Sequence, residues 1–352
     1  MLMVKKAENK GKELSVEERL ELITRNLQEV IGKEELMALL KEGKEVSVYW
    51  GTMPTGSPHV SYLYPLLKVA DFLKAGLKVK ILIADLHAAL DGVSWDILDK
   101  RQAYYEALIP LMLQGVGVDT RKLEFVKGSM MQSQPEYFKD LLRLSTLTAV
   151  NDATRAASEV VKLGDNPKLG GIIYPLMQAL DEEYLGVDIQ FGGTDQRKIF
   201  VYAREYLPKI GYRARVELMN YMLPGLLGQK MSSSIPGSKI DMLDSKEDVE
   251  KKINNALCAE GDVNNGLLAF CKYVLFVIKQ DNNESLIIER PEKFGGTVDY
   301  RGYDNLEKDY AEKKVHPQDL KKVVAKEINA LLEPLRGKNE LRALYDRAYP
   351  GR

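Results

Sequence analysis

Cysteine is scarce in this sequence, and its scarcity argues against two ways of holding a fold together. Cys258 and Cys271 are the only cysteines among the 352 residues, and they lie thirteen positions apart without histidine or cysteine neighbours at the spacing of a metal site. We therefore expect neither a disulfide framework nor a zinc site. Free thiols are typical of a reducing compartment, so we expect a cytoplasmic protein.

Long apolar runs and a large net charge are missing as well. No stretch approaches the ~20 apolar residues that cross a bilayer, and the first twelve residues are charged, without the apolar core of a signal peptide. We expect no membrane association. The 50 basic residues are balanced by 51 acidic residues, so a nucleic-acid partner would have to be bound by a local basic surface.

The pattern of apolar residues predicts a parallel sheet. Short β-rich runs at 46–50, 79–84, 123–126 and 187–191 are separated by long helical patterns such as 103–113, which is typical of strands wrapped by helices. Single hydrophobic cores stop growing near about 250–300 residues. A chain of this length is therefore expected to form two domains.

Helical patterns flank the predicted sheet on both sides. Ser15 and Glu18 form a capping box ahead of apolar residues at helical spacing up to Val30. Another capped helix begins at Ser245, and no convincing strand follows it. We predict an α/β fold with a Rossmann-like parallel-sheet domain over residues 1–240, connective helices inserted at about 130–170, and a mainly helical domain over 241–352.

Two loops far apart in the sequence are each suited to binding phosphate. Residues 51–59 leave a strand through glycine and proline and open into a helical stretch, where free N–H groups and the helix dipole favour an anion. Residues 230–234 offer an ammonium group and three hydroxyls to a phosphate chain that gains charge in a transition state. Each loop alone would be an ordinary turn or surface loop, but together they predict a nucleotide site.

A predicted helix carries three polar side chains on one face. Tyr174, Gln178 and Asp181 are spaced by four and three residues among apolar neighbours. Such a stripe fits either an amphipathic surface helix or a pocket with a polar floor. Tyr49, at the end of the first predicted strand, is either an ordinary strand aromatic or a residue of the same pocket.

Other strand ends add polar groups to the expected crevice. Gly192 and Gly193 let a nucleotide approach the backbone closely, and Asp195 suits ribose hydroxyls. Ligands of open parallel sheets bind at the carboxyl ends of the strands, where this turn and the loop 51–59 would both lie. We interpret His87, at another strand end, as a structural residue or one that supports the site.

These segments together resemble class I aminoacyl-tRNA synthetases, and in particular the tyrosyl-tRNA synthetases of eukaryotes and archaea. The "HIGH" motif reads His59-Val60-Ser61-Tyr62, and the "KMSKS" motif reads Lys230-Met231-Ser232-Ser233-Ser234. Ser61, Tyr62 and Ser233 depart from the usual glycine, second histidine and second lysine. The Tyr-x-x-x-Gln-x-x-Asp pattern from Tyr174 matches the family. The resemblance extends from about residue 15 to about residue 340.

The resemblance implies a tyrosine–tRNA ligase that uses ATP and Mg²⁺, makes tyrosyl-adenylate and charges tRNA(Tyr). Tyr49 and Asp181 would hold the substrate phenol, while Tyr174, Gln178 and Gln196 would hold its ammonium and carboxyl end. The remaining roles fall to three groups: catalytic His59, Lys230, Ser232 and Ser233; ATP-binding Gly51, Pro54, Thr55, Gly56, His59, Gln190, Gly193, Asp195, Lys230 and Met231; and tRNA-binding Arg197, Phe294 and Asp319.

The resemblance also implies an anticodon-binding role for the domain 241–352, no metal held by protein ligands, and a homodimer. Met130, Met131 and the apolar stretch 140–150 could form the dimer interface. Without the resemblance, Phe294 would be read as a core aromatic and Asp319 as a helix cap.

Two other functions stay open at the level of sequence. A tryptophanyl-tRNA synthetase would share the fold, although the pair Tyr49 and Asp181 argues against it. A noncatalytic RNA-binding or signalling module could retain the synthetase shape, although intact His59, Lys230 and Gln196 argue against decay of the active site.

Overall fold

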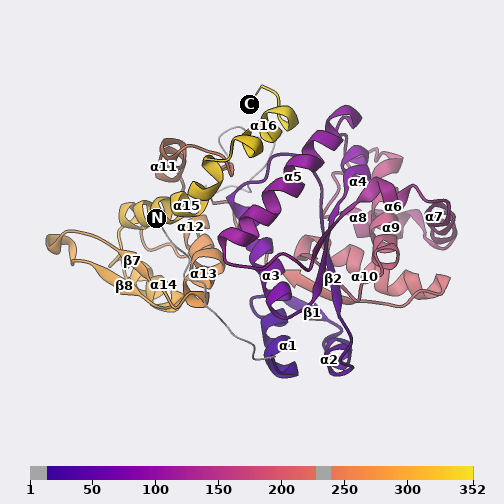
Figure 1. Ribbon diagram of the computed structural model, residues 1–352, viewed down its shortest axis with the longest axis horizontal. Coiled ribbons are helices and arrows are strands. Elements are labelled where there is room, and N and C mark those ends of the chain that lie inside the picture. Colours follow the sequence, from indigo (N-terminus) through magenta and orange to yellow (C-terminus); the bar gives the residue numbers. More distant parts are fainter. Residues whose placement is uncertain (1–13, 227–238, 352) are drawn as a thin grey trace. The chain divides into compact units, whose positions relative to one another are not determined.

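The computed structural model describes residues 14–226 and 239–351 (Figure 1). The predicted loop 230–234, with Lys230, Met231, Ser232 and Ser233, lies outside these residues. The chain divides into two compact units. The first, which we call the sheet unit, takes in the chain up to Thr55, Lys68–Glu106 and Gly117–Met222; the second, the C-terminal unit, takes in Gly56–Leu67, Ala107–Val116 and the chain from Leu223 onward. The predicted domain boundary near residue 240 stays a prediction.

Six strands form one sheet in the sheet unit, in the order β1-β6-β5-β2-β3-β4. All neighbouring strands are parallel except β1 and β6, so the predicted α/β class with a parallel sheet is confirmed. The strands are β1 Glu29–Ile31, β2 Ser47–Thr52, β3 Lys78–Ile83, β4 Leu123–Lys127, β5 Ile189–Gly193 and β6 Val216–Asn220.

The strand order reverses between β2 and β5. From β2 the sheet continues through β3 and β4 on one side, and the chain then returns to place β5 and β6 on the other side. Two successive crossovers therefore leave the carboxyl ends of β2 and β5 in opposite directions, and a crevice opens between them. This is the position where open α/β sheets bind their ligands.

Helices cover both faces of the sheet. The face that carries Tyr49 belongs to a core cluster with residues of α7 and α9, such as Tyr137 and Leu180. On the opposite face, Phe191 of β5 packs edge-on against Phe72 of α3, with ring centroids 5.2 Å apart. The sheet unit contains α1 Val16–Thr24, α2 Lys33–Lys41, α4 Asp85–Leu90, α6 Gly128–Gln132, α7 Pro135–Leu147, α8 Val150–Ala157, α9 Leu169–Tyr184 and α10 Arg197–Tyr206, while α3 Leu63–Lys74 and α5 Trp95–Gly115 have residues in both units.

The first helix begins as predicted but ends earlier. The Ser15 hydroxyl accepts a hydrogen bond from the backbone N–H of Glu18 at 3.1 Å, and the Glu18 carboxylate accepts one from the Ser15 N–H at 2.7 Å, which completes the capping box. The prediction that helical structure continues to Val30 is wrong. Asn26 has a left-handed φ of 58°, which breaks the helix, and Val30 pairs with β6 instead.

The C-terminal unit is mainly helical, as predicted. The Ser245 hydroxyl accepts from the Asp248 N–H at 3.0 Å and so caps α11. The prediction of no further strand is wrong, because β7 and β8 pair antiparallel; each has only three residues, too few to show a period-2 pattern. The elements are α11 Lys246–Asn254, α12 Gly266–Phe270, α13 Phe276–Asp281, β7 Leu286–Ile288, β8 Val298–Tyr300, α14 Tyr303–Ala311, α15 Pro317–Arg336 and α16 Asn339–Ala348.

None of the helices in the two described stretches combines the length and the apolar character that a bilayer-spanning helix needs.

Candidate active site

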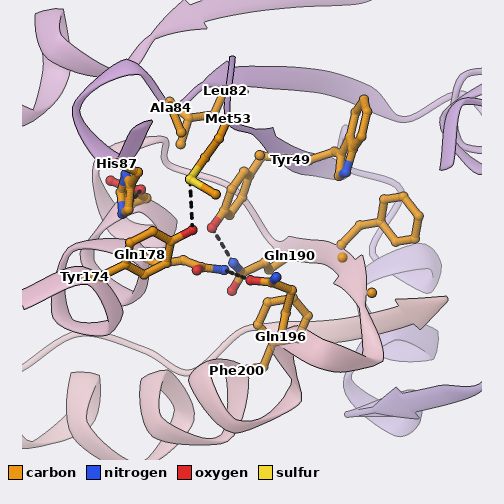
Figure 2. A pocket seen from close by; sticks show the side chains of 16 residues that line it. Tyr49, Met53, Leu82, Ala84, His87, Tyr174, Gln178, Gln190, Gln196 and Phe200 are labelled. Atoms are coloured by element: carbon orange, nitrogen blue, oxygen red, sulfur yellow. Dashed lines mark hydrogen bonds and ion pairs between the residues drawn. The ribbon is translucent and has the colours of Figure 1, made fainter. Parts of the chain in front are cut away.

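A pocket of about 140 Å³ lies at the carboxyl ends of β2 and β5, against α9 (Figure 2). All five residues predicted to hold the amino acid line it, together with three predicted to contact ATP. They are Tyr49, Tyr174, Gln178, Asp181 and Gln196, with Gly51, Gln190 and Gly193. The crevice that the strand order creates is therefore lined by the polar groups that the sequence placed at strand ends and on one helix face.

Tyr49 points its hydroxyl into this pocket (Figure 2). Tyr49 and Gln190 are in register on neighbouring strands, and the Gln190 amide N–H donates a hydrogen bond to the Tyr49 oxygen. Burial raises the pKa of Tyr49 well above its ordinary value, and the charge of Asp181 raises it further. Tyr49 is therefore a neutral phenol whose oxygen accepts from Gln190, which leaves its own proton for a ligand.

Asp181 presents one bonded and one unbonded oxygen. Its Oδ1 accepts from the Gln132 amide at 2.8 Å and from the Tyr137 hydroxyl at 2.9 Å. Its Oδ2 is buried and has no hydrogen-bond partner within residues 14–226 and 239–351. A buried carboxylate oxygen without a donor is costly, so Oδ2 is the natural acceptor for a hydroxyl that enters the pocket.

Burial also sets the charge of Asp181. It raises the pKa of this carboxyl to about 7, against the hydrogen bonds from Gln132 and Tyr137, which lower it. The carboxylate is thus close to its titration point at neutral pH. The two donors stabilise the ionised form, which is the form that accepts a hydrogen bond.

His87 lies beside the same carboxylate as a neutral ring. Its Nε2 is 4.0 Å from Asp181 Oδ2, and its ring meets the Tyr174 ring edge-on with centroids 4.5 Å apart. Burial lowers the pKa of His87 to about 4, so it carries no charge at neutral pH. The interpretation of His87 as a supporting residue stays a prediction.

The opposite end of the pocket carries amide groups. The Gln178 amide N–H donates to the Gln196 side-chain oxygen at 3.0 Å, and the Tyr174 hydroxyl lies 3.5 Å from the Met53 sulfur (Figure 2). Gly192 makes this arrangement possible, because a Cβ there would approach the Phe200 ring to 2.8 Å and Gln196 Cγ to 3.1 Å. Donors and acceptors here suit an ammonium and a carboxylate group.

The described residues that were predicted to bind ATP belong partly to the sheet unit and partly to the C-terminal unit. Besides the three in the pocket, Pro54 and Thr55 follow β2, and their carbonyl oxygens accept from the Arg101 guanidinium at 3.0 and 2.7 Å. Asp195 follows β5 within the short 3-10 turn Thr194–Gln196. Gly56 and His59 belong to the C-terminal unit.

His59 precedes the 3-10 turn Val60–Tyr62 that leads into α3. Its pKa is lowered to about 4, chiefly by burial and then by the charge of Lys239. His59 is therefore uncharged at neutral pH, and it would act on a phosphate as a neutral hydrogen-bond donor.

The three residues predicted to bind tRNA are placed as follows. Arg197, at the start of α10, makes a two-point ion pair with Glu29, with N–O distances of 2.7 and 2.9 Å. Phe294 is 62% exposed and so is not a core aromatic. Asp319 is not the helix cap, because His316 caps α15 by accepting from the Gln318 N–H at 3.1 Å.

Gln132 and Tyr137 were not predicted as site residues. They lie on α6 and α7, 49 and 44 residues before Asp181. No local spacing connects them to it, because their positions depend on how these two helices pack against α9. The burial of Gln132 is a property of the fold, so the sequence offers no signal that singles it out.

Comparisons with known proteins lead to the same family that the pocket residues resemble. Residues 41–333 match the family described as tRNA synthetases class I (W and Y). The chain is 53% identical over 340 residues to the cytoplasmic tyrosine–tRNA ligase of Gallus gallus, covering 95% of this chain and 64% of that protein. It is 48% identical over 342 residues to the cytoplasmic tyrosine–tRNA ligase of Saccharomyces cerevisiae, covering 94% and 87%.

A solved structure leads to the same family. The crystal structure of tyrosyl-tRNA synthetase complexed with L-tyrosine from Archaeoglobus fulgidus has a TM-score of 0.83 and 37% identity, and the match covers 95% of this chain and 100% of that chain. The chain spans 64–65% of the length of the vertebrate relatives. The family match and the yeast relative, which is covered for most of its length, are decisive: this chain belongs to the class I tyrosyl-tRNA synthetases.

Proposed function

We propose that this protein is a tyrosine–tRNA ligase that activates tyrosine with ATP and transfers it to the terminal adenosine of tRNA(Tyr). The observation that supports this best is the pair of hydrogen-bonding groups that line the pocket, Tyr49 with a free proton and Asp181 with an unbonded oxygen. The yeast and vertebrate relatives are named cytoplasmic, and we propose the same location for this chain.

The pocket offers a consistent chain of donors to a substrate phenol. Gln190 donates to Tyr49, Tyr49 would donate to the phenol oxygen, and the phenol would donate to Asp181 Oδ2. The Tyr49 oxygen and the substrate phenol oxygen then each have one donor and one acceptor partner, and Asp181 Oδ2 gains a donor. Phenylalanine would leave Tyr49 and Asp181 unpaired in a buried site, and rejection of a substrate that lacks the hydroxyl is well known for tyrosyl-tRNA synthetases themselves.

The reaction would proceed in two steps. A carboxylate oxygen of tyrosine attacks the α-phosphorus of ATP, the bond from this phosphorus to the bridging oxygen breaks, and pyrophosphate leaves with the electron pair. A hydroxyl of the terminal adenosine then attacks the tyrosyl carbonyl carbon, AMP leaves, and the hydroxyl proton is released to the medium. No residue of the protein forms a covalent bond with the substrate.

His59 and Lys230 would stabilise the charge that develops on the phosphates, with Ser232 and Ser233 as further donors. Gly51, Pro54, Thr55, Gly56, Gly193, Asp195 and Met231 would contact the nucleotide. Mg²⁺ would enter on the phosphates of ATP, as is usual for this ion. Among the described residues, no group of three or more His, Cys, Asp or Glu side chains is arranged to hold a metal ion.

The tRNA would contact two surfaces. Arg197 would bind the acceptor end, for which it would have to exchange its ion pair with Glu29 for a phosphate or a base. In the C-terminal unit, exposed Phe294 would stack on an anticodon base and Asp319 would accept hydrogen bonds from another. Arg290 connects the segment that carries Phe294 with the segment that precedes α15 and Asp319. Its guanidinium donates to the carbonyl oxygens of Gly296, at 2.8 Å, and of Lys314.

Pyrophosphate exchange measured with each of the twenty amino acids tests the proposed function. Exchange that depends on tyrosine alone is the expected result. Exchange with tryptophan would support a tryptophanyl-tRNA synthetase instead, and no exchange with any amino acid, together with retained tRNA binding, would support the noncatalytic module.

The affinity for tyrosine is expected to fall below neutral pH. The pKa of Asp181 is raised to about 7 in the free protein, and a protonated Asp181 offers the substrate phenol no acceptor. The dissociation constant should therefore rise as the pH falls through about 7, approaching a tenfold rise per pH unit. Calorimetric titration between about pH 5.5 and 8 checks this. Binding that is independent of pH across this range would contradict it; His87, with a pKa of about 4, does not titrate there.

We further propose a homodimer that forms through the helices α6 to α9. Large apolar side chains are exposed on this part of the chain, namely Met130, Phe138, Leu142, Leu147, Val150 and Leu169. Exposed apolar surface of this extent marks association sites, and most homodimers are two-fold symmetric. Met131, which the sequence placed at the same interface, is buried and does not contribute.

Charged residues on this surface should separate the subunits. The double variant Phe138→Lys with Leu142→Lys is expected to sediment as a monomer while the unmodified chain sediments as a dimer, because four like charges would meet across a two-fold interface. Leu257→Lys, at an exposed apolar residue of the C-terminal unit, is the matched control and should remain dimeric. A dimeric double variant would show that the interface lies elsewhere.

A further inference from the structure

A buried polar cluster lies beneath the loop that carries His59. Ser57, Lys239 and Asp241 are each less than 10% exposed, and Tyr345 of α16 lies beside them. The Ser57 hydroxyl is hydrogen-bonded to Asp241 Oδ2, and the Tyr345 hydroxyl lies 3.4 Å from the same oxygen. All four residues belong to the C-terminal unit, and none of them has a role in the function proposed above.

The Lys239 ammonium is directed at this cluster. Its Nζ lies 2.9 Å from the carbonyl oxygen and 2.5 Å from the hydroxyl oxygen of Ser57, and 3.7 Å from Asp241 Oδ2. The two Ser57 oxygens lie within hydrogen-bond distance of the ammonium, and the Asp241 carboxylate adds an ion-pair contact. Lys239 therefore connects Ser57 and Asp241 within the cluster.

The cluster joins two segments that the sequence separates by about 180 residues. The Val60 N–H donates to the Ile240 carbonyl oxygen at 3.0 Å, and His59 pairs with Asp241 as an antiparallel bridge. The charge of Lys239 also acts on His59, since it lowers the pKa of that ring after the larger effect of burial. The start of the His59 segment is thus fixed to the chain nine residues after Lys230.

We propose that Ser57, Lys239 and Asp241 are positioning residues for tyrosine activation, which hold the His59 loop against the segment that follows the Lys230 loop. This inference rests on the proposed function. The two loops must act on the same phosphates, and displacement of a catalytic group by about 1 Å can cost 10²-fold in rate. A buried three-point contact at the base of the His59 loop would supply that precision.

The proposal separates two properties of the protein. The tyrosine pocket is lined by residues of the sheet unit, whereas Ser57, Lys239 and Asp241 belong to the C-terminal unit. Loss of the cluster should therefore leave tyrosine binding unchanged and impair only the step that consumes ATP. A general loss of folding would impair both.

Two variants test this without leaving a charge buried and unpaired. Ser57→Ala removes the hydroxyl that bonds both ions, and the double variant Lys239→Met with Asp241→Leu replaces the ion pair by apolar groups of similar size, a change that is often tolerated. The expected result is a kcat of tyrosine-dependent pyrophosphate exchange that falls about 10-fold in the first and up to about 100-fold in the second, with an unchanged dissociation constant for tyrosine. Combining all three changes should add little, because the residues act as one unit.

Asp309→Asn is the matched control. Asp309 lies in the same unit and accepts from the Tyr300 hydroxyl at 2.9 Å, so its loss removes a comparable hydrogen bond away from the loop, and its exchange rate should equal that of the unmodified chain. The proposal fails if both test variants exchange within twofold of the unmodified chain, or if they lose tyrosine binding in parallel with exchange. An unmodified chain that binds tyrosine but does not exchange would overturn the proposed function itself, and this inference with it.

Discussion

Replacement of Asp181 by asparagine is expected to lower kcat/KM for tyrosine by roughly 10²-fold, mainly through KM. The asparagine oxygen can still accept from Gln132 and Tyr137, which are 2.8 and 2.9 Å from Oδ1 in the unmodified chain. An amide nitrogen then replaces Oδ2, and it meets the substrate hydroxyl as a donor. The loss of a hydrogen bond to a charged group costs about 1.5–3 kcal/mol, and an unpaired buried donor adds to this.

The same variant should discriminate less well between tyrosine and phenylalanine. When phenylalanine is bound to the unmodified chain, no hydroxyl lies opposite Asp181 and a buried carboxylate oxygen stays unpaired, which weakens the binding of phenylalanine. An unpaired neutral amide costs less free energy than an unpaired carboxylate, so the variant penalises phenylalanine less. Exchange kinetics with both amino acids measure the change, and Asp140→Asn is the matched control, since Asp140 is also buried and accepts from a tyrosine hydroxyl, that of Tyr184 at 2.9 Å.

Asp181→Asn is expected to lower activity without lowering the stability of the fold. The folded-state pKa of Asp181 is about 7, against an ordinary value of 3.8, so the folded chain retains a proton that the unfolded chain has lost. The contribution of this group to the free energy of unfolding therefore falls as the pH rises from about 4 through 7. At about pH 8 the asparagine variant should melt no lower than the unmodified chain.

A kcat/KM of the asparagine variant within threefold of the unmodified value would show that Asp181 does not hold the phenol.

The part of the site that sequence could predict is the part that local geometry determines. Tyr174, Gln178 and Asp181 line one pocket because a helix repeats every 3.6 residues. Tyr49 and Gly193 meet them because strands of a parallel sheet end at the same edge. The first inference needs only helix geometry, and the second needs only the general rule for where parallel sheets bind ligands.

The part that sequence could not predict depends on such packing. Gln132 and Tyr137 reach Asp181 only because α6 and α7 pack beside α9, and no spacing within the chain encodes that contact. Strand β6 was missed for a related reason: Glu217 interrupts its apolar pattern, yet this residue is fully buried in the sheet. A buried charged residue defeats a prediction that identifies core positions by hydrophobicity.

Gln190 shows how a predicted residue can have an unexpected partner. The resemblance to the family assigned it to ATP binding, and that role stays a prediction. In the structure it is 1% exposed and donates to Tyr49. The cross-strand register that pairs them depends on β5 adding to the sheet beside β2, which is a topological choice that the sequence of β5 does not reveal.

Replacement of Lys230 by alanine is expected to lower kcat for pyrophosphate exchange by roughly 10²- to 10³-fold. Lys230 lies outside the described residues, so this expectation rests on the motif and on chemistry. Negative charge accumulates on the leaving pyrophosphate, and the family's usual second lysine is replaced by Ser233. Since His59 is held uncharged by burial, Lys230 would be the cation of the two phosphate-binding motifs, and its loss leaves that charge to Mg²⁺ and neutral donors.

The effect should be confined to the transition state. Loss of a charge that acts only as the bond to pyrophosphate breaks lowers kcat without weakening the ground-state binding of tyrosine, so calorimetry should give an unchanged dissociation constant. Binding of tRNA should also persist, which distinguishes the loss of catalysis from the loss of the fold. Lys308→Ala, at an exposed lysine of α14, removes the same charge elsewhere and should exchange normally. If Lys230→Ala exchanges at the unmodified rate, the charge on pyrophosphate is balanced by a group other than this motif.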